Sequence, residues 1–407
     1  MKVCLKTSGC AYNQADSDAL ARALEAGSVV LASESEADVL VYNTCSVKQN
    51  TQDKLLSSIG RCTKPLVVTG CLSQANPELV LAANSRAVIL PIASQGNILR
   101  AVESALKKTR ATFPPKPAFG VRVHSGVARV RIASGCAGNC TYCLTRLARG
   151  KLASRPISEV VEEVREAIAL GAVEIQLCGQ DAGAYGLDSG SSLGELLDAV
   201  NAVPGRFYCR VGMLNPRLAD ASLWTHYGKE FKFLHAPIQS ASDSVLRDMN
   251  RPYDYAAFKS VMRSFRRAFP TGMTATDLIV GYPTETEDDF QETLDALAEQ
   301  RFVVVNVSKY SSRPGTPAAR LERLPTKTVK ERSTRASALA QKIALEENEA
   351  RIGKEFDAVV VERGSKGGYI ARTTDYFPVV LEGVKLGEFC SVWITGAGRA
   401  HLVGRVI

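Results

Sequence analysis

The sequence of 407 residues has only four histidines and two tryptophans, and it contains no long apolar run. We find no stretch of roughly 18 uncharged apolar residues, so we expect no helix that crosses a membrane. The N-terminus, Met-Lys-Val-Cys-Leu-Lys, has no extended apolar segment of the kind that marks a secretory signal. These absences predict a cytoplasmic protein with no membrane partner.

Acidic residues are missing from one long window of the chain. Between Lys107 and Arg155 there is no Asp or Glu. A solvated basic surface is the simplest interpretation, but with a net charge of +8 the window favours a phosphate-rich partner. The window contains eleven basic residues, namely Lys107, Lys108, Arg110, Lys116, Arg122, Arg129, Arg131, Arg146, Arg149, Lys151 and Arg155.

Cysteine, in contrast, is abundant, with eleven residues in the chain. The number is odd, and the spacing differs from that of a small secreted disulfide scaffold. Metal binding in a reducing compartment explains so many thiols better. The length and the ordinary globular composition predict two to three domains.

Three of the cysteines, Cys136, Cys140 and Cys143, lie inside the acid-free window with the spacing C-x3-C-x2-C. Three thiolates on one loop can hold three corners of a [4Fe-4S] cluster and leave one iron open for another ligand. Zinc is the alternative, but it needs a fourth ligand, and no histidine occurs between Cys143 and His226. The spacing is that of the radical S-adenosylmethionine (SAM) enzymes, which this segment resembles.

The pattern of apolar residues predicts an α/β protein with three regions. Residues 1–106 alternate strands and helices and predict a small doubly wound α/β domain that contains the auxiliary cluster described below. Residues 107–120 contain three prolines and predict a linker. The expected elements of the first region are strands at 39–42 and 65–69 and helices at 16–26 and 50–59.

Residues 121–342 repeat a strand followed by a helix. Six such units predict a parallel sheet curled into a partial (βα)6 barrel, whose chemistry belongs at the C-terminal ends of the strands. The three-cysteine loop directly follows the first strand. The expected strands are 128–133, 173–178, 207–213, 231–236, 274–280 and 303–309.

Residues 346–407 change to short strands separated by turns that contain glycine. This pattern predicts a small antiparallel β-barrel of the kind found in oligonucleotide-binding modules. The expected strands are 356–362, 368–372, 377–381 and 390–394.

Three further cysteines are far apart in the sequence but share one local setting. Cys10 follows a strand-like start, and Cys45 and Cys71 each end a predicted strand. Because the C-terminal ends of parallel strands meet at one edge of a sheet, the three thiols could converge there and hold a second cluster. Spacing alone leaves open the alternative that they are buried thiols of the core.

The residues around these cysteines resemble the three cluster-binding motifs of the radical SAM methylthiotransferases. The motifs are Gly9-Cys10 with Asn13 and Asp16-Ser17, Asn43-Thr-Cys45 with Val47-Lys48, and Thr69-Gly-Cys71 with Gln74. The C-terminal region resembles the TRAM domain of these enzymes, which is an RNA-binding barrel.

The run from Cys143 to Ser154 is similar to the archaeal and eukaryotic branch of the family, which acts on N6-threonylcarbamoyladenosine in tRNA. Two positions depart from the usual pattern. Ala241 stands where glycine is usual, and Gly179-Gln180 replaces a Ser-Glu pair.

The resemblance implies two [4Fe-4S] clusters and SAM as cofactors. Cys136, Cys140 and Cys143 would hold the catalytic cluster, which reduces SAM to a 5′-deoxyadenosyl radical that abstracts the C2 hydrogen of the modified adenine. Sulfur would come from or through the cluster on Cys10, Cys45 and Cys71, and a second SAM would supply the methyl group. The implied partners are the anticodon stem-loop of tRNA, modified at position 37, and an electron donor such as a flavodoxin or ferredoxin.

The resemblance also suggests SAM-binding residues. Tyr142 precedes the third cysteine, Gln180 and Asp181 end the second strand, and Arg210 could pair with the SAM carboxylate. Gln239 is a further candidate. Each of these residues has a structural alternative as a cap or as part of the barrel rim.

Two other functions remain open from the sequence. The first is a methylthiotransferase that acts on another modified adenosine or on a ribosomal protein side chain. The second is a non-catalytic RNA-binding protein whose cysteines hold structural metal. The second cysteine set and the complete barrel argue against this last interpretation.

Overall fold

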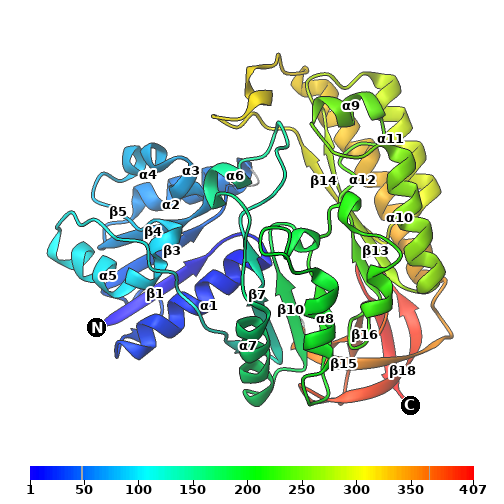
Figure 1. Cartoon of the computed structure of the whole chain (residues 1–407), viewed down its shortest axis with the longest axis horizontal. Coiled ribbons are helices and arrows are strands. Elements are labelled where there is room, and N and C mark those ends of the chain that lie inside the picture. Colours follow the sequence, from blue (N-terminus) through cyan, green and yellow to red (C-terminus); the bar gives the residue numbers. More distant parts are fainter. Residues whose placement is uncertain (47–48, 366) are drawn as a thin grey trace.

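The computed structural model describes residues 1–46, 49–365 and 367–407, and it divides into three regions that follow one another along the chain (Figure 1). Val47 and Lys48 of the second motif lie outside the described residues. Among the described residues, no helix has the length and apolarity that crossing a membrane requires.

The first region is a parallel five-stranded sheet in the order β2-β1-β3-β4-β5. Helices α1 and α5 cover one face of the sheet, and α2, α3 and α4 cover the other, so the predicted doubly wound fold is confirmed. The strands are β1 (Lys2–Thr7), β2 (Val30–Leu31), β3 (Val39–Thr44), β4 (Leu66–Gly70) and β5 (Val88–Ile89). The helices are α1 (Ala11–Ala26), α2 (Gln49–Arg61), α3 (Cys71–Ala75), α4 (Pro77–Ala83) and α5 (Ile98–Lys107).

Helix α1 begins at Ala11, earlier than the predicted residue 16. Its first turns bury Tyr12, Asn13 and Asp16. Because these side chains are polar or amphipathic, they interrupt the apolar period from which the helix start was predicted. The chain then leaves α5 and continues through residues 109–122 without a helix or strand, as predicted for the linker.

The central region has six parallel strands in two sheets, β11-β10-β7-β6 and β12-β13-β14, in which only β6 is antiparallel to its neighbour. A parallel bridge between Cys209 and Glu230 connects the two sheets. The strands are β6 (Val123–His124), β7 (Val127–Arg131), β10 (Glu174–Cys178), β11 (Tyr208–Val211), β12 (Phe233–His235), β13 (Met273–Val280) and β14 (Val304–Lys309).

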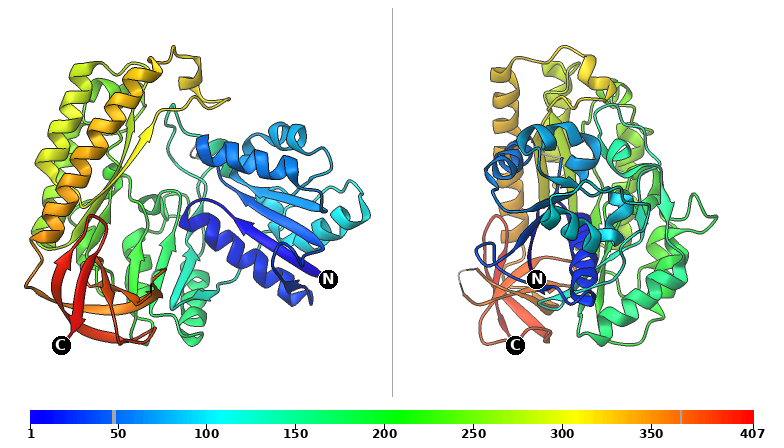
Figure 2. Two further views of the ribbon diagram at one scale, coloured as in Figure 1. Left: turned by 180° about the vertical axis from the view of Figure 1, so that it is seen from behind. Right: turned by 90° about the vertical axis from the view of Figure 1, so that its left-hand side faces the viewer.

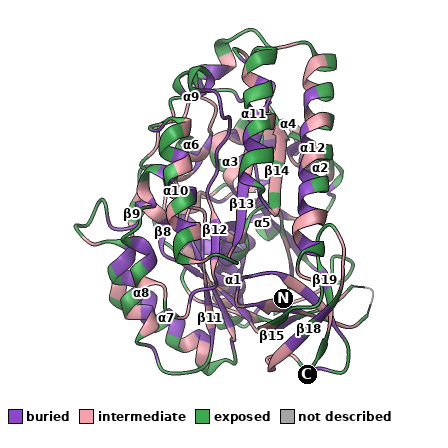
Figure 3. Cartoon of the chain, turned by 90° about the vertical axis from the view of Figure 1, so that its right-hand side faces the viewer, coloured by how far each residue is buried: buried purple, intermediate pink, exposed green. Residues whose placement is uncertain are grey.

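Helices surround the outer face of this partial barrel, and their outward surfaces are exposed (Figure 3). They are α7 (Ile157–Ala169), α8 (Leu193–Asn201), α9 (Asp243–Asp248), α10 (Tyr255–Ala268), α11 (Glu287–Gln300) and α12 (Thr326–Glu349). The apolar residues Val130, Ile175 and Leu177 pack against these helices in the core. The alternate residues Arg129 and Gln176, which are neighbours in the register, face the other side of the sheet.

The third region is a closed barrel in the order β15-β16-β17-β19-β18. Its strands pair antiparallel except for β17 and β19, which are parallel. The sequence did not predict the last strand, because Gly404 and Arg405 interrupt its apolar pattern. The strands are β15 (Glu355–Arg363), β16 (Tyr369–Thr373), β17 (Pro378–Leu381), β18 (Phe389–Ala397) and β19 (Leu402–Val406).

This small barrel covers one end of the central barrel (Figures 1 and 2). Phe231, Phe233 and Met273, which lie at or near the starts of β12 and β13, share a hydrophobic core with Phe377 and Val379 of the small barrel. The N-terminal ends of the central strands are therefore closed. Their C-terminal ends remain available for a functional site, as the βα architecture predicts.

Candidate functional site

The first cysteine group lies on a loop between β8 (Ala133–Ser134) and α6 (Thr145–Arg149). The loop is closed at its base, where the Cys136 backbone N–H donates to the Gly150 carbonyl at 3.3 Å. Gly135 has φ +77°, and a Cβ there would lie 2.0 Å from the Lys151 carbonyl oxygen, so this close crossing requires glycine. These contacts at the base of the loop therefore fix the position of Cys136.

Each thiol of this group receives a hydrogen bond from a nitrogen. The backbone N–H of Gly138 donates to Cys136 Sγ at 3.2 Å and that of Thr145 to Cys143 Sγ at 3.4 Å. A side chain supplies the third donor, because Arg251 Nη1 lies 3.3 Å from Cys140 Sγ. Nitrogen donors of this kind stabilise thiolate ligands and tune the potential of an iron–sulfur cluster.

Two of the thiols lie close to the same residue of the loop. A Cβ on Gly138 would lie 3.4 Å from Cys136 Sγ and 4.0 Å from Cys140 Sγ, so both thiols flank the same piece of backbone. Across the described ranges, no three His, Cys, Asp or Glu side chains are placed to hold one metal ion. A cubane cluster binds each thiolate to a different iron.

The free Cys136 thiol is protonated near neutral pH. Burial raises its pKa to about 11, although the Gly138 N–H works in the opposite direction. Binding of iron to this group therefore releases a proton.

The second cysteine group lies at one edge of the first sheet. Cys10 precedes α1, Cys45 directly follows β3, and Cys71 is the first residue of α3 after β4. The register pairs Thr7 with Asn43 and Asn43 with Thr69, so the three strand ends lie side by side. The sheet topology thus brings the three cysteines to the same edge.

Gly9 makes the close approach of Cys10 and Cys45 feasible. It has φ +117°, and a Cβ there would lie only 3.0 Å from Cys45 Sγ. A larger residue would displace the Cys45 side chain.

Asn13 and Arg149 place Cys71 relative to the strand ends. Asn13 Nδ2 donates to the carbonyls of Ser8 and Thr44, each at 2.9 Å, and its Oδ1 lies 3.7 Å from Cys71 Sγ. Arg149 Nε donates to Cys71 Sγ at 3.4 Å. Burial raises the pKa of the Cys71 thiol, and the charge of Arg149 opposes that rise.

A buried ion network joins the first region to the central barrel. Asp16 of α1 pairs with Arg131 of β7 at 2.9 Å and with Arg149 of α6 at 2.6 Å. All three side chains are at most 10% exposed. Helices α3 and α6 lie side by side at this junction (Figure 1). From the sequence, Asp16 was noted only as part of a cysteine motif and Arg149 only as a member of the basic window. Their pairing was not predicted.

Two of the proposed SAM-binding residues follow β10. Gln180 Oε1 is buried and has no hydrogen-bond partner within the described part of the chain, so this acceptor can take a donor from a ligand. Asp181 is buried and accepts from the Asn215 N–H at 3.1 Å. Burial raises the pKa of Asp181, and this hydrogen bond partly offsets the rise.

Tyr142 and Gln239 also lie near the ends of strands. Tyr142 packs against Met249 and Tyr282, and burial raises its pKa, with Arg251 opposing. Gln239 has φ +66°, a conformation that costs energy for a residue other than glycine, and its N–H donates to the Asp277 carbonyl at 2.9 Å. Strained backbone of this kind is concentrated at functional sites.

Arg210 lies deeper in the barrel than the other candidates. It pairs in register with Gln176, and its guanidinium lies 5.2 Å from the Phe233 ring and 5.5 Å from the Tyr376 ring. Its Nε is buried with no hydrogen-bond partner among the described residues. The guanidinium thus lies toward the end of the barrel that the C-terminal barrel covers, and its Nε is available there as a donor.

Apart from Arg129, which is half-buried, the basic window separates into paired and exposed residues. Arg131 and Arg149 share Asp16, Arg122 pairs with Glu25 at 3.3 Å, and Arg155 pairs with Glu163. These acidic partners lie outside the window in the sequence. These arginines of the window are therefore paired although the window itself contains no acidic residue. The exposed members that remain for a polyanion are Lys107, Lys108, Arg110, Lys116, Arg146 and Lys151.

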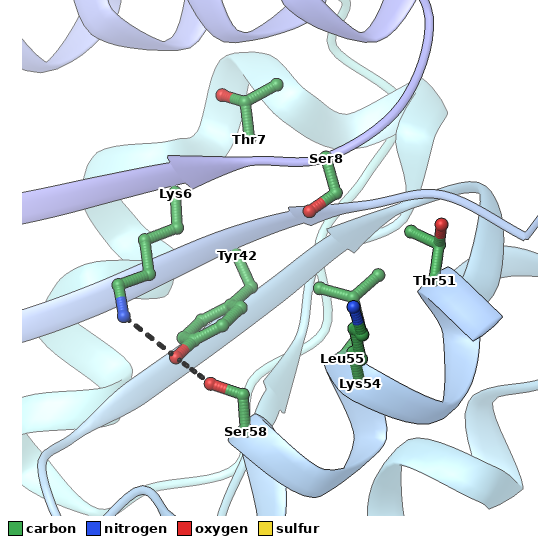
Figure 4. A pocket seen from close by; sticks show the side chains of 8 residues that line it. All are labelled: Lys6, Thr7, Ser8, Tyr42, Thr51, Lys54, Leu55 and Ser58. Atoms are coloured by element: carbon green, nitrogen blue, oxygen red, sulfur yellow. Dashed lines mark hydrogen bonds between the residues drawn. The ribbon is translucent and has the colours of Figure 1, made fainter.

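A hollow of about 450 Å³ is lined by residues of β1, β3 and α2 and by Ser8 (Figure 4). Within it, Lys6 Nζ donates to the Tyr42 hydroxyl at 3.4 Å, and that hydroxyl lies 2.8 Å from Ser58 Oγ. Lys6 also pairs with Glu34, so its charge is largely balanced. The lining residues are Lys6, Thr7, Ser8, Tyr42, Thr51, Lys54, Leu55 and Ser58.

Comparison with known families gives two matches. Residues 130–297 match the radical SAM superfamily, and residues 2–90 match the "Uncharacterized protein family UPF0004". The first match covers the cysteine loop of the central barrel, and the second covers all three cysteines of the first region.

Curated relatives match the full chain. A protein of Methanothermobacter thermautotrophicus, named probable threonylcarbamoyladenosine tRNA methylthiotransferase, is 36% identical over 99% of both chains. One of the same name from Archaeoglobus fulgidus is 38% identical over 100% of this chain and 99% of its own. The Drosophila melanogaster threonylcarbamoyladenosine tRNA methylthiotransferase is 37% identical over 100% of this chain and 78% of its own length.

Solved structures share the fold at low sequence identity. The radical SAM methyltransferase TsrM of Kitasatospora setae, solved with cobalamin and a [4Fe-4S] cluster, matches with a TM-score of 0.59 and 16% identity. The match covers 78% of this chain and 77% of TsrM. These values confirm the predicted radical SAM architecture.

Proposed function

The chain belongs to the threonylcarbamoyladenosine tRNA methylthiotransferases, a family of radical SAM enzymes, and we propose on that premise that it adds a methylthio group to C2 of N6-threonylcarbamoyladenosine at position 37 of tRNA. The observation that carries the proposal is a contact between the helix that follows the first cysteine group and a cysteine of the second group. Arg149, six residues beyond Cys143 of the first group, contacts Cys71 of the second. Radical generation and sulfur supply would thus take place at adjoining sites.

The first group fits a [4Fe-4S] cluster that binds SAM. Its three thiols each receive a nitrogen donor, and the unpartnered acceptor of Gln180 lies at the end of the next strand. When bound, the cluster and SAM would supply the radical chemistry that removal of the unreactive C2 hydrogen requires. Cys136, Cys140 and Cys143 would hold the cluster.

Five residues of the barrel would bind SAM. Gln180 would accept from the SAM amino group, and Tyr142 and Asp181 would shape the site around it. The strained backbone of Gln239 points to a role at the same rim. Arg210 would offer its unpartnered Nε to the carboxylate from within the barrel.

The second group fits a second [4Fe-4S] cluster through which sulfur would reach the substrate. Cys10, Cys45 and Cys71 would hold it, and Cys10 is the most exposed of the three. Gly9 lets Cys45 lie against the backbone beside Cys10, and Asn13 ties together the ends of β1 and β3. These residues would keep the ligands in place while sulfur is transferred.

The tRNA would be held by its anticodon stem-loop. The exposed lysines and arginines of the basic window would contact phosphates, and the C-terminal barrel would act as an RNA-binding TRAM domain. A flavodoxin or ferredoxin would supply electrons.

Mass spectrometry of tRNA nucleosides tests this function. In cells that lack the gene, 2-methylthio-N6-threonylcarbamoyladenosine should disappear and its unmethylthiolated precursor should accumulate. Restoring the gene with Cys136→Ala should leave the precursor unmodified. An unchanged amount of the methylthio nucleoside in the deletion strain would contradict the substrate, and a methylthio group lost from another adenosine or from a ribosomal protein in that strain would identify the alternative.

A further inference from the structure

Arg149 occupies an unusual position between the two cysteine groups. It ends α6, the short helix that follows Cys143, but its side chain leaves the central barrel and enters the first region. The side chain is only 2% exposed. A buried guanidinium needs several partners to balance the loss of hydration.

The partners of Arg149 all come from the motifs of the second cysteine group. Its Nε donates to Cys71 Sγ at 3.4 Å, and its Nη2 donates to Asn13 Oδ1 at 2.7 Å. Nη2 also lies 2.6 Å from Asp16 Oδ2, and the guanidinium carbon lies 4.7 Å from the Tyr12 ring. The planar fork of arginine is suited to reaching several such groups at once.

The charges at this junction leave a positive excess beside Cys71. Asp16 is one carboxylate between two guanidiniums, those of Arg131 and Arg149. An arginine guanidinium stays protonated in proteins, so the junction places excess positive charge beside Cys71.

The backbone connects Arg149 rigidly to the first cysteine group. The carbonyl of Gly150, the next residue, accepts the hydrogen bond from the Cys136 N–H. A displacement of the Cys136–Cys143 loop would thus move the guanidinium that touches Cys71.

We propose that Arg149 is a positioning residue that connects the two cluster sites by holding the Cys71 ligand and setting the electrostatic environment of the second cluster. The inference rests on the proposed function, because it assumes a cluster on Cys10, Cys45 and Cys71. Positive charge and an N–H···S bond both stabilise the reduced state of such a cluster. Loss of Arg149 should therefore lower its reduction potential.

The test uses full-length protein in which Cys136, Cys140 and Cys143 are all alanine, so that only the second cluster remains. In this background we compare Arg149→Met with Arg146→Met, which removes an exposed arginine from the same helix. The readouts are iron and sulfide content, the EPR spectrum of the reduced cluster, and its reduction potential by redox titration.

We expect Arg149→Met to lower the reduction potential and change the EPR spectrum, or to lose the cluster while circular dichroism shows a folded protein. Arg146→Met should leave all three readouts unchanged. A fully loaded Arg149→Met protein with the unaltered spectrum and potential would overturn the inference.

If Arg149→Met does not fold, Arg149→Lys serves as the test variant. Its ammonium keeps the charge but cannot reach Cys71, Asn13 and Asp16 together, so an altered spectrum supports the inference and an unaltered one overturns it. A background protein that binds no iron would instead contradict the proposed second cluster, which distinguishes the two failures.

Discussion

The two cysteine groups are assembled in different ways. Cys136, Cys140 and Cys143 lie on one loop, and two of their three nitrogen donors belong to the backbone of that loop or of the residues just after it. Cys10, Cys45 and Cys71 come from three strand ends, and the donor to Cys71 comes from another region of the chain. The first group therefore depends on local geometry, whereas the second depends on the sheet and on the contact between regions.

The largest effect should come from a substitution in the first cysteine group. Cys140→Ala removes a proposed ligand of the cluster that would activate SAM, so both SAM cleavage and tRNA methylthiolation should fall to background. Anaerobic assay of 5′-deoxyadenosine and of the modified nucleoside measures both. Product formation by this variant would show that the loop does not generate the radical.

A change in the second group should separate the two activities. Cys10→Ala leaves the catalytic loop intact, so 5′-deoxyadenosine should still form while methylthiolation is lost. The same two assays apply, with Cys62→Ala as the control because Cys62 is a core thiol outside the cysteine groups. Methylthiolated tRNA from the Cys10 variant would refute the role of this group in sulfur transfer.

Breaking the buried ion network between the first region and the central barrel should destabilise the protein. Asp16→Asn leaves Arg131 and Arg149 buried without their shared carboxylate, which should lower the free energy of unfolding by about 3–5 kcal/mol. Urea unfolding of the purified protein measures this change. A loss below about 1 kcal/mol would show that the network contributes little to the junction.

Removing the side-chain donor of the first cysteine group should have a smaller effect. Arg251→Met removes the donor to Cys140 Sγ but leaves the three thiols in place, so SAM cleavage should fall by about 10- to 100-fold. Tyr253→Phe, which removes the hydroxyl that accepts from Arg251 Nε at 3.0 Å but keeps the Nη1 donor to Cys140 Sγ, is the matched comparison. If cleavage by the Arg251 variant equals that of the wild type, the hydrogen bond has no role in this cluster.

The smallest effect is expected from a second ion pair between α1 and the barrel. Arg22 and Glu166 are both more than a third exposed, so water already screens their interaction. Glu166→Gln should change the free energy of unfolding by less than about 1 kcal/mol. A loss as large as that of Asp16→Asn would mean that burial does not distinguish the two pairs.

The same contrast explains how much the sequence could predict. Spacing alone singled out the Cys136 loop as a candidate site, because all three proposed ligands lie in one motif, and the βα repeat predicted the partial barrel. The positions of Cys45 and Cys71 after buried strands predicted one shared edge, which the register of β3 and β4 bears out.

The contacts between regions could not be predicted in this way. The pairing of Asp16 with Arg131 and Arg149 joins residues more than a hundred positions apart, and no periodicity marks it. The basic window looked unpaired because the acids that neutralise part of it lie elsewhere in the chain. The last strand was missed because a glycine and an arginine interrupt its pattern.

The central claim is that the chain has two separate cluster sites, one local and one assembled by the fold. Iron and sulfide content after anaerobic reconstitution tests it directly. The wild type should bind about eight irons, and replacing either cysteine group with three alanines should leave about four. About four irons in the wild type, with none left after the loss of Cys136, Cys140 and Cys143, would contradict a second cluster site.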